Sequence, residues 1–169
     1  MNWTTRDLNE HPNRDKLLSK SVKEETSTNS SNETTGKLTF TAIADPVGKP
    51  RMTRSDKWRK RPAVLRYRTF CDQLREATPR KVFCLDVYAI EVKAFIAMPA
   101  SWSKRKKQAH AGTSHRSKPD WDNIAKAVCD ALFEEDCAIS DGLTRKRWCY
   151  ESEQRLEITV WFNTEKTGS

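Results

Sequence analysis

The sequence is poor in the residues that build nitrogen- and sulfur-based metal sites or that cross-link small domains. It has three histidines and five cysteines, an odd number of cysteines without a C-x-x-C pair. Neither a zinc site nor a disulfide framework is indicated, and we expect the cysteines to be small buried apolar residues. No apolar run approaches the roughly 20 residues of a membrane-spanning helix, and the N-terminal residues lack a charged-then-apolar signal pattern. We therefore expect a cytoplasmic protein that does not contact a membrane.

Negative charge is scarce relative to positive charge. The 169 residues include 31 Lys and Arg against 23 Asp and Glu, a formal net charge of +8. The first 36 residues hold five of the basic and six of the acidic side chains, so the positive excess belongs to the rest of the chain. Solubility alone can explain a basic protein, but the clustering described below favours a surface that binds phosphate.

The N-terminal segment has a composition unlike that of the rest of the chain. It is rich in Ser, Thr, Asn, Glu and Lys, and residues 27–36 include no large apolar side chain. Such a segment cannot bury enough surface to offset the entropy lost on ordering. We expect a disordered arm over residues 1–36, one domain over residues 37–164 and a short tail over residues 165–169.

Hydrophobic periodicity within the domain predicts four strands and two or three helices. An alternating pattern indicates strands at residues 38–43, 82–98, 138–150 and 155–162, the last two joined as a hairpin around residues 151–154. A helical stripe begins at Pro62 and stops before Pro79, and a second one follows Asn123 as far as Phe133. A short basic helix after Ser103 is the third.

Basic residues concentrate in two stretches of the domain. Residues 49–68 contain nine Lys and Arg against the single acid Asp56, and a further basic run follows Ser103. A solvated helix face usually mixes both signs, so this one-sided charge favours contact with the phosphates of a nucleic acid. The candidate DNA-binding residues are Lys49, Arg51, Arg54, Lys57, Arg59, Lys60, Arg61, Lys104, Arg105 and Lys118, with the run 145–147 as a further basic segment.

Acidic residues gather where the predicted helix at residues 123–133 begins. Asp120 and Asp122 lie two apart at the junction of an extended segment and this helix, so their carboxylates can converge on one point. A hard cation such as Mg²⁺ prefers one or two carboxylates with waters and phosphate oxygens. Asp136 follows 14 residues after Asp122, and an antiparallel return beside the helix would bring it back to the pair. Lys126 lies one helical turn beyond Asp122 and can stabilise charge on a phosphate.

A purely structural interpretation of these residues remains open at this point. An aspartate at a helix N-terminus is an ordinary cap and a favourable partner of the helix dipole. Lys126 with Asp122 and Asp130 has the spacing of an i,i+4 ion-pair ladder. The surrounding positive charge favours the catalytic interpretation, because unneutralised carboxylates repel a phosphate unless a metal ion bridges them.

The run K-P-D-W-D-N-I-A-K-A-V-C-D-A-L-F at residues 118–133, followed by E-D-C-A-I-S-D, resembles the signature of the RusA family of Holliday junction resolvases, which phages and prophages often carry. The resemblance extends over roughly residues 38–162 and is most specific in the D-x-D-N-x-x-K-x-x-x-D core. It implies an α/β (α+β) domain with a mixed four-stranded sheet. It also implies a homodimer that binds a four-way DNA junction and nicks two opposed strands symmetrically with Mg²⁺, in recombination and repair.

Carried over by position, the resemblance assigns roles to single residues. Asp120, Asp122 and Asp136 match the metal-binding acids of the family, and Lys126 matches its catalytic lysine. Glu135 stands where the family commonly has an aspartate and is a candidate to assist Asp136. Asn123 and Asp130 match recurrent positions that shape the helix. Trp58, Trp102 and Trp121 are candidates to insert into the open centre of a junction, and packing at the edge of the core is an equal alternative for each.

Two other functions are compatible with the same residues. In a basic nucleic-acid-binding module without catalysis, the aspartates would cap a helix and the basic runs would supply the whole function. In a metal-dependent nuclease for other branched DNA, such as flaps or forks, the chemistry would be the same and the substrate different.

Overall fold

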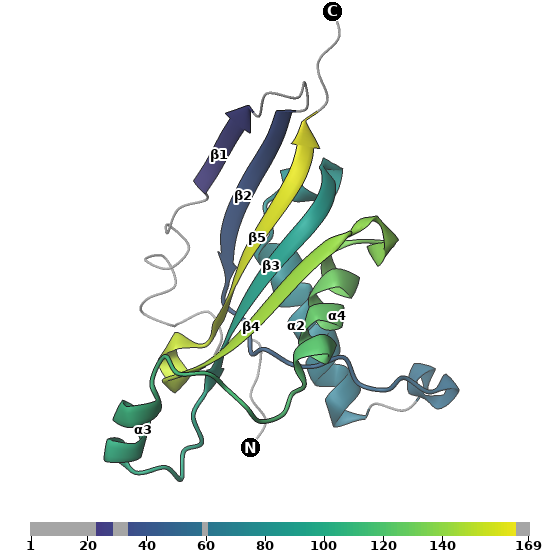
Figure 1. Cartoon of the computed structure of the whole chain (residues 1–169). Coiled ribbons are helices and arrows are strands. Elements are labelled where there is room, and N and C mark those ends of the chain that lie inside the picture. The colour runs from purple at the N-terminus through teal and green to yellow at the C-terminus, as the bar shows by residue number, and fades with distance from the viewer. Residues whose placement is uncertain (1–22, 29–33, 59–60, 165–169) are drawn as a thin grey trace, which may run out of the picture.

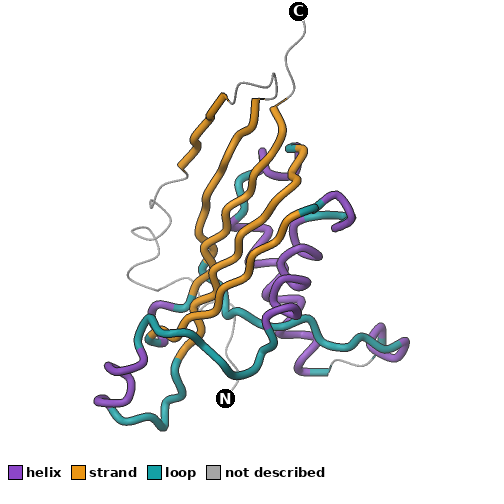
Figure 2. The backbone as a smooth tube through the Cα atoms, in the orientation of Figure 1, coloured by secondary structure: helices purple, strands orange, loops and turns teal. Residues whose placement is uncertain are grey.

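A five-stranded mixed sheet organises the chain. The computed structural model describes residues 23–28, 34–58 and 61–164. The strands are β1 (Lys23–Thr28), β2 (Thr34–Ala42), β3 (Asp86–Ala97), β4 (Asp141–Cys149) and β5 (Arg155–Thr164), in the spatial order β1-β2-β5-β3-β4. Three α-helices are described, α2 (Pro62–Ala77), α3 (Lys104–His110) and α4 (Trp121–Leu132), with short 3-10 turns at Arg54–Lys57 (η1), Arg80–Cys84 (η2), Asp136–Ala138 (η3) and Glu151–Glu153 (η4). The strands form one twisted layer with α2 and α4 on the same side of it (Figures 1 and 2).

The pairing confirms the predicted α/β class and the mixed character of the sheet. β3 pairs in parallel with β4 and antiparallel with β5, which in turn pairs antiparallel with β2. These four strands are the ones that the sequence predicts. β1 adds a fifth strand at the outer edge of β2, so the predicted number of strands is corrected from four to five.

The extra strand lies within the segment for which we expect disorder. Lys23–Thr28 forms β1, and β2 begins at Thr34, before the predicted start of the domain. Threonine is frequent in both strands, and antiparallel pairing between them satisfies backbone groups that a composition argument counts as exposed. The expected arm is therefore wrong for these residues, and its remainder, residues 1–22 and 29–33, lies outside the described residues, as does the whole predicted tail, residues 165–169.

The predicted hairpin of the last two strands is also wrong. β4 and β5 run in opposite directions and a short segment with η4 joins them, but β3 lies between them in the sheet. β3 has the longest apolar pattern of the five strands, with its buried positions Val87, Ile90, Val92, Ala94 and Ile96. A strand of this kind is stabilised most by neighbours on both edges, so it takes the place between β4 and β5.

The core lies between the sheet and the pair α2 and α4. Each helix buries one stripe: Val64, Tyr67, Phe70, Cys71 and Leu74 in α2, and Ile124, Ala127, Val128, Ala131 and Leu132 in α4. The facing side chains of the sheet are almost fully buried, including Leu38, Phe40, Val92, Leu156, Ile158 and Val160. Because α4 packs against α2, β3 and β4 together, the position of its first turn is fixed relative to the sheet.

The cysteines agree only in part with the expectation that they are buried. All five cysteines are free thiols; Cys71 and Cys149 are buried as expected, but Cys84 and Cys137 are exposed. No helix in the described part of the chain combines the length and the apolar character that crossing a membrane requires.

Candidate active site

The two aspartates of the D-x-D pair lie at the N-terminal end of α4. Asp120 has extended backbone (φ −67°, ψ 150°) and occupies the N-cap position, where its carbonyl oxygen accepts a hydrogen bond from the backbone N–H of Ile124 at 3.2 Å. Its carboxylate makes no capping hydrogen bond. Asp122 lies in the first helical turn, and both aspartates are exposed. The carboxylate of Asp120 is thus not used for the structural role that an N-cap aspartate usually has.

The first turn of α4 is held in place from the β2–α2 connection. The backbone N–H of Lys49 donates to the carbonyl oxygen of Asn123 at 3.0 Å. A Cβ added at Gly48 would lie 3.1 Å from Cβ of Asn123 and 3.2 Å from Cβ of Pro119, so glycine permits this close approach. Lys49 Nζ also pairs with Asp130 Oδ2 at 2.6 Å, and that carboxylate accepts a hydrogen bond from the Tyr67 hydroxyl at 3.0 Å. The ammonium of Lys49, predicted to contact DNA, therefore has an internal partner.

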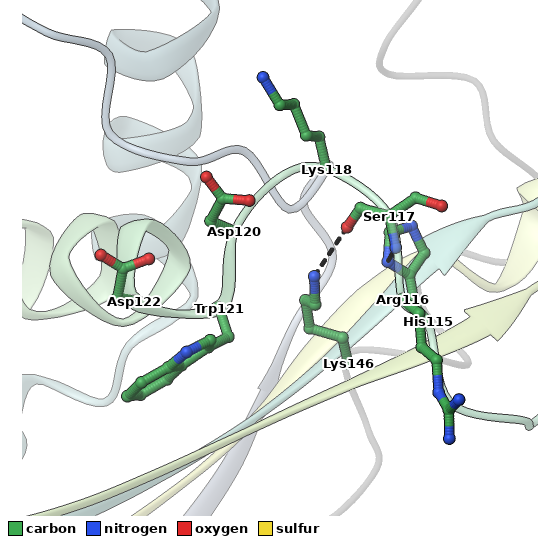
Figure 3. Close-up of a pocket in the computed structure, with 8 residues that line it drawn as sticks. All are labelled: His115, Arg116, Ser117, Lys118, Asp120, Trp121, Asp122 and Lys146. Atoms are coloured by element: carbon green, nitrogen blue, oxygen red, sulfur yellow. Dashed lines mark hydrogen bonds between the residues drawn. The ribbon is translucent and has the colours of Figure 1, made fainter.

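An open pocket of about 690 Å³ lies beside the two aspartates. It is lined by Asp120, Trp121 and Asp122 of the α4 start, by residues 115–118 of the preceding loop, and by Lys146 of β4. Figure 3 shows both carboxylates on one side of this pocket, with Lys146 and the loop opposite them. Four of the lining side chains carry basic or imidazole nitrogens, so the pocket presents acids and cations to the same space.

The loop that enters the site is bonded to β4 through Lys146 and to itself through His115. Lys146 Nζ donates to the carbonyl oxygens of Ser117 and Pro119, each at 2.7 Å. His115 is buried and its ring packs on Trp148 with 4.0 Å between centroids. Burial lowers the pKa of His115, and the nearby charge of Lys146 lowers it further. The neutral imidazole can accept, and its Nδ1 receives the backbone N–H of Ser117 at 3.3 Å.

The structure brings together two of the three predicted metal ligands. Asp136 begins η3, beyond the C-terminal end of α4, and the 12 residues of α4 span about 18 Å at 1.5 Å per residue. The expected return of Asp136 to the pair is wrong within one chain, because Asp136 lies in η3, which follows the C-terminal end of α4, and the chain returns only with β4. The side chain of Asp136 lies outside what the structure describes, and among the side chains that are described no cluster of three His, Cys, Asp or Glu can hold a metal ion.

Lys126 and Lys146 occupy different places relative to the pocket. Lys126 is exposed on α4 one turn after Asp122, does not line the pocket, and has no ion-pair partner among the residues that the structure describes. The i,i+4 ion-pair ladder of the purely structural interpretation is therefore not formed among the described residues, since Asp130 pairs with Lys49 instead. Lys146 is a lining residue that sequence reasoning treated only as part of a basic run. The sequence signal that could have identified Lys146 is the alternation of side chains along β4, which places Lys146 on the opposite face of the sheet from Arg145 and Arg147.

The loop between β2 and α2 is organised by one buried acid. Asp56 is 5 % exposed and accepts hydrogen bonds from the Thr53 backbone at 2.6 Å, from Arg61 Nε at 2.5 Å and from Arg61 Nη2 at 2.6 Å. Arg61 Nη2 also donates to the Arg51 carbonyl at 2.9 Å. This cluster is called the Asp56 clasp below. Arg61, predicted to bind DNA, serves to close the clasp.

Beyond the clasp, four of the predicted DNA-binding residues lie on two projections of the described structure. Arg51 and Arg54 are exposed on the η1 loop, where Trp58 is 86 % exposed; Arg59, Lys60 and the Lys57 side chain lie outside what the structure describes. Lys104 and Arg105 are exposed on α3, and Lys118 is exposed at the pocket. The η1 loop and α3 project at the same end of the domain, on either side of the loop that carries Asp120 (Figure 1).

The three tryptophans considered as wedges have different surroundings. Trp102 packs between His110 and Trp148, with 5.0 Å between ring centroids in each case, and Lys106 Nζ lies 4.1 Å from its centroid. It therefore anchors α3 to the domain. Trp121 is 61 % exposed at the pocket, and Trp58 is the most exposed of the three. The structure thus leaves Trp58 and Trp121 accessible to a ligand.

Comparison with known proteins now identifies the family. The family model described as endodeoxyribonuclease RusA matches residues 44–161. The chain belongs to the RusA endodeoxyribonuclease family. The matched span includes the β2–α2 connection, Asp120, the whole of α4 with Asp122, and most of β5. No match was found among curated proteins. Membership of the family implies endodeoxyribonuclease activity.

The Asp56 clasp makes a specific prediction for titration. Hydrogen bonds from Arg61, and then from the Thr53 backbone, lower the pKa of Asp56 from 3.8 to about 2. Because the folded pKa is depressed, the clasp contributes stability above about pH 4 and loses it as the pH falls toward 2. A carbon-13 NMR titration of the side-chain carboxyl should show this low value, and Arg61→Ala should move it back toward 3.8.

Asp72 is a suitable internal control for this titration. It is exposed and lies 3.8 Å from Arg75, an arrangement that contributes little at a protein surface. Its resonance should not respond to Arg61→Ala. An Asp56 carboxyl that titrates at its ordinary value in the wild-type protein would show that the clasp is not formed.

Proposed function

We propose that the protein is a Mg²⁺-dependent endonuclease that resolves four-way DNA junctions as a homodimer, nicking two opposed strands. One observation carries this proposal: the carboxylate of Asp120 makes no helix-capping hydrogen bond and lies with Asp122 in an open pocket that Lys118 and Lys146 also line. Membership of an endodeoxyribonuclease family supports the chemistry. The exposed basic projections on either side of the pocket support a large, branched nucleic-acid substrate.

The residues of the pocket suit a hard divalent cation. Mg²⁺ is usually held by one or two carboxylates together with water and substrate phosphates, and Asp120 and Asp122 are the exposed pair that can supply the protein oxygens. When bound there, the ion would activate water and neutralise charge on the phosphate. The basic side chains of Arg116 and Lys118 would draw the phosphate toward the carboxylates, which would repel it on their own.

Lys126 is the proposed catalytic lysine. It lies one turn beyond Asp122, it is exposed, and no carboxylate among the described residues neutralises it. An ammonium in this position can bind a non-bridging phosphate oxygen and stabilise the charge that grows during attack. The family resemblance assigns the same role to this position.

The position of Asp136 bears on the proposed dimer. Within one chain the length of α4 separates Asp136 from the pair, and this separation supports a site whose third carboxylate is Asp136 of a second copy. A two-fold dimer supplies one Asp136 to each of its two sites, because contacts in such an interface are reciprocal. Two equivalent sites would also match the approximate two-fold symmetry of a four-way junction. We propose this shared arrangement for the third ligand.

The role of Asp122 is tested by removing its charge. Asp122→Asn should lower the single-turnover cleavage rate in Mg²⁺ by at least about 10²-fold, because a neutral amide is a poor ligand for a hard cation. Junction affinity, measured without divalent cation, should stay the same or rise slightly as one negative charge is lost. Asp72→Asn, an exposed substitution on α2, is the matched control. Unchanged cleavage by Asp122→Asn would remove this residue from the mechanism.

Mixed dimers test whether Asp136 acts across the interface. Asp122→Asn and Asp136→Asn proteins should each be inactive alone, and co-expression should give heterodimers in which one site has both wild-type side chains. The mixture should recover about a quarter of the wild-type sites and nick one strand. If the three carboxylates came from one chain, both sites of each heterodimer would be damaged and the mixture would stay inactive. A monomeric solution mass would exclude the shared site directly.

Substrate preference separates a junction resolvase from a nuclease for other branched DNA. In Mg²⁺ the wild-type protein should cut a four-way junction faster than a flap assembled from the same sequences. Its junction affinity should fall about 10³-fold or more between roughly 50 and 200 mM salt if six or more phosphates are contacted. Equal cleavage of junction and flap would contradict the proposed substrate, and a salt-independent affinity would exclude the basic projections as its binding surface.

A further inference from the structure

We propose that Lys146 is a positioning residue of the site: it clamps the loop that carries Asp120 and so holds that carboxylate beside Asp122. The inference rests on the proposed function for its catalytic consequence, but the clamp itself is a property of the free protein. Neither the sequence pattern nor the match to the family assigns this role to Lys146.

The geometry of the clamp is specific. Lys146 Nζ donates to the carbonyl oxygens of Ser117 and Pro119 at 2.7 Å each, so one ammonium bridges two points on either side of Lys118. The second of these points is the residue directly before Asp120. Hydrogen bonds from a charged donor are about twice as strong as neutral ones. Figure 3 shows the Lys146 side chain extending from β4 to this loop, with the two aspartates beyond it.

Other contacts support the same loop but do not replace the clamp. His115 Nδ1 accepts the Ser117 N–H at 3.3 Å, and Gly48 packs under Pro119 and Asn123. The preceding residues pair with the outer edge of β4, where His115 N donates to the Lys146 carbonyl at 3.1 Å and Trp148 N donates to that of Thr113 at 3.0 Å. These bonds order the loop up to Ser117. Between Ser117 and the start of α4, Lys146 is the side chain among the described residues that donates a hydrogen bond to the backbone, at Pro119.

The fold places Lys146 there through the matched lengths of α4 and β4. From Asp120 the chain runs about 18 Å along the 12 residues of α4, turns at η3, and returns along β4. Lys146 is five residues after Asp141, the first residue of β4, a return of about 17 Å at 3.3 Å per residue. The return strand therefore brings a lysine, rather than Asp136, back beside the aspartates.

The neighbours of Lys146 cannot take its place. Side chains alternate along a strand, and Arg145 pairs with Glu91 on the other face of the sheet, while Arg147 Nη1 donates to the Lys146 carbonyl at 3.0 Å and to Ser114 Oγ at 3.3 Å. Lys146 itself donates to carbonyls, and among the described residues it has no carboxylate partner. Its full charge remains at the pocket, where it also offsets the repulsion between Asp120 and Asp122.

The test compares Lys146→Met with Lys146→Arg. Methionine keeps a similar unbranched shape but cannot donate, whereas a guanidinium can donate to both carbonyls. Lys93→Met removes one lysine from the adjacent strand β3 and is the matched control, because Lys93 pairs with Glu91 away from the pocket. Thermal unfolding and circular dichroism show that each variant is folded before the site is examined.

Hydrogen exchange of the metal-free, DNA-free protein reports the clamp directly. The amides of Ser117 and Ile124, which donate to His115 Nδ1 and to the Asp120 carbonyl, should exchange about tenfold faster in Lys146→Met, because local opening of the loop becomes easier, while Lys146→Arg and Lys93→Met should match the wild type. Exchange in Lys146→Met equal to that in Lys93→Met would overturn the proposal. This readout remains decisive if the wild-type protein cuts no junction, an outcome that would defeat the proposed function alone.

The catalytic consequence is measured on the same variants. Lys146→Met should raise the Mg²⁺ concentration for half-maximal cleavage and lower the saturated rate, each about 10- to 100-fold, as observed when an outer-shell partner of a metal ligand is removed. Lys146→Arg should recover most of both losses. Junction affinity without divalent cation should fall no more than about threefold. A loss of affinity as large as the loss of cleavage, with unchanged Mg²⁺ dependence, would make Lys146 a phosphate contact and overturn the positioning role.

Discussion

The packing of α4 under the sheet is the constraint on which the site depends. Five side chains of this helix are buried against α2 and the strands, so neither its axis nor its first turn can move without opening the core. Asp122 lies in that turn, so the packing of α4 also fixes its position. Asp120 does not, since it precedes the helix and its carboxylate makes no capping bond. The two halves of the D-x-D pair are therefore held by different interactions, one by the core and the other by the loop.

This division explains why polar contacts concentrate on the segment before α4. A loop that presents a carboxylate to solvent cannot be fixed by burial, and hydrogen bonds to its carbonyls and amides are the remaining means. Lys49 bonds the backbone of Asn123 from one side, and Lys146 bonds the backbone of Ser117 and Pro119 from the other. The Lys49 donor is a backbone N–H, and its side chain is paired with Asp130. The Lys146 donor is an ammonium, so the bonds on that side of the loop also leave positive charge beside the two aspartates.

Local sequence patterns predicted the elements well, and their partners poorly. The stripe of α4, the strand at β3 and the extended entry to Asp120 follow from spacing, because each depends on residues close together in the chain. The place of β3 between β4 and β5 does not, since alternation shows that a strand has a buried face but not which edges it pairs. The same limit applies to β1, which owes its order to β2 rather than to its own composition. Asp136 was misplaced in one chain for a related reason: its distance from Asp122 depends on where the chain turns.

The net charge of a segment does not show which of its cations can bind DNA, because a basic residue is available to DNA only if the fold leaves it unpaired. Lys49 is held by Asp130, and Arg61 is held by Asp56, although both belong to the most one-sided basic stretch of the chain. Their partners are half-buried or buried acids that composition counts as ordinary surface charge. The exposed cations that remain, such as Arg51, Arg54, Lys104 and Arg105, lie on projections flanking the pocket. Internal ion pairs thus reduce the number of cations available to phosphate, and the proposed branched substrate would meet those on the η1 loop and α3 on either side of the aspartate pair.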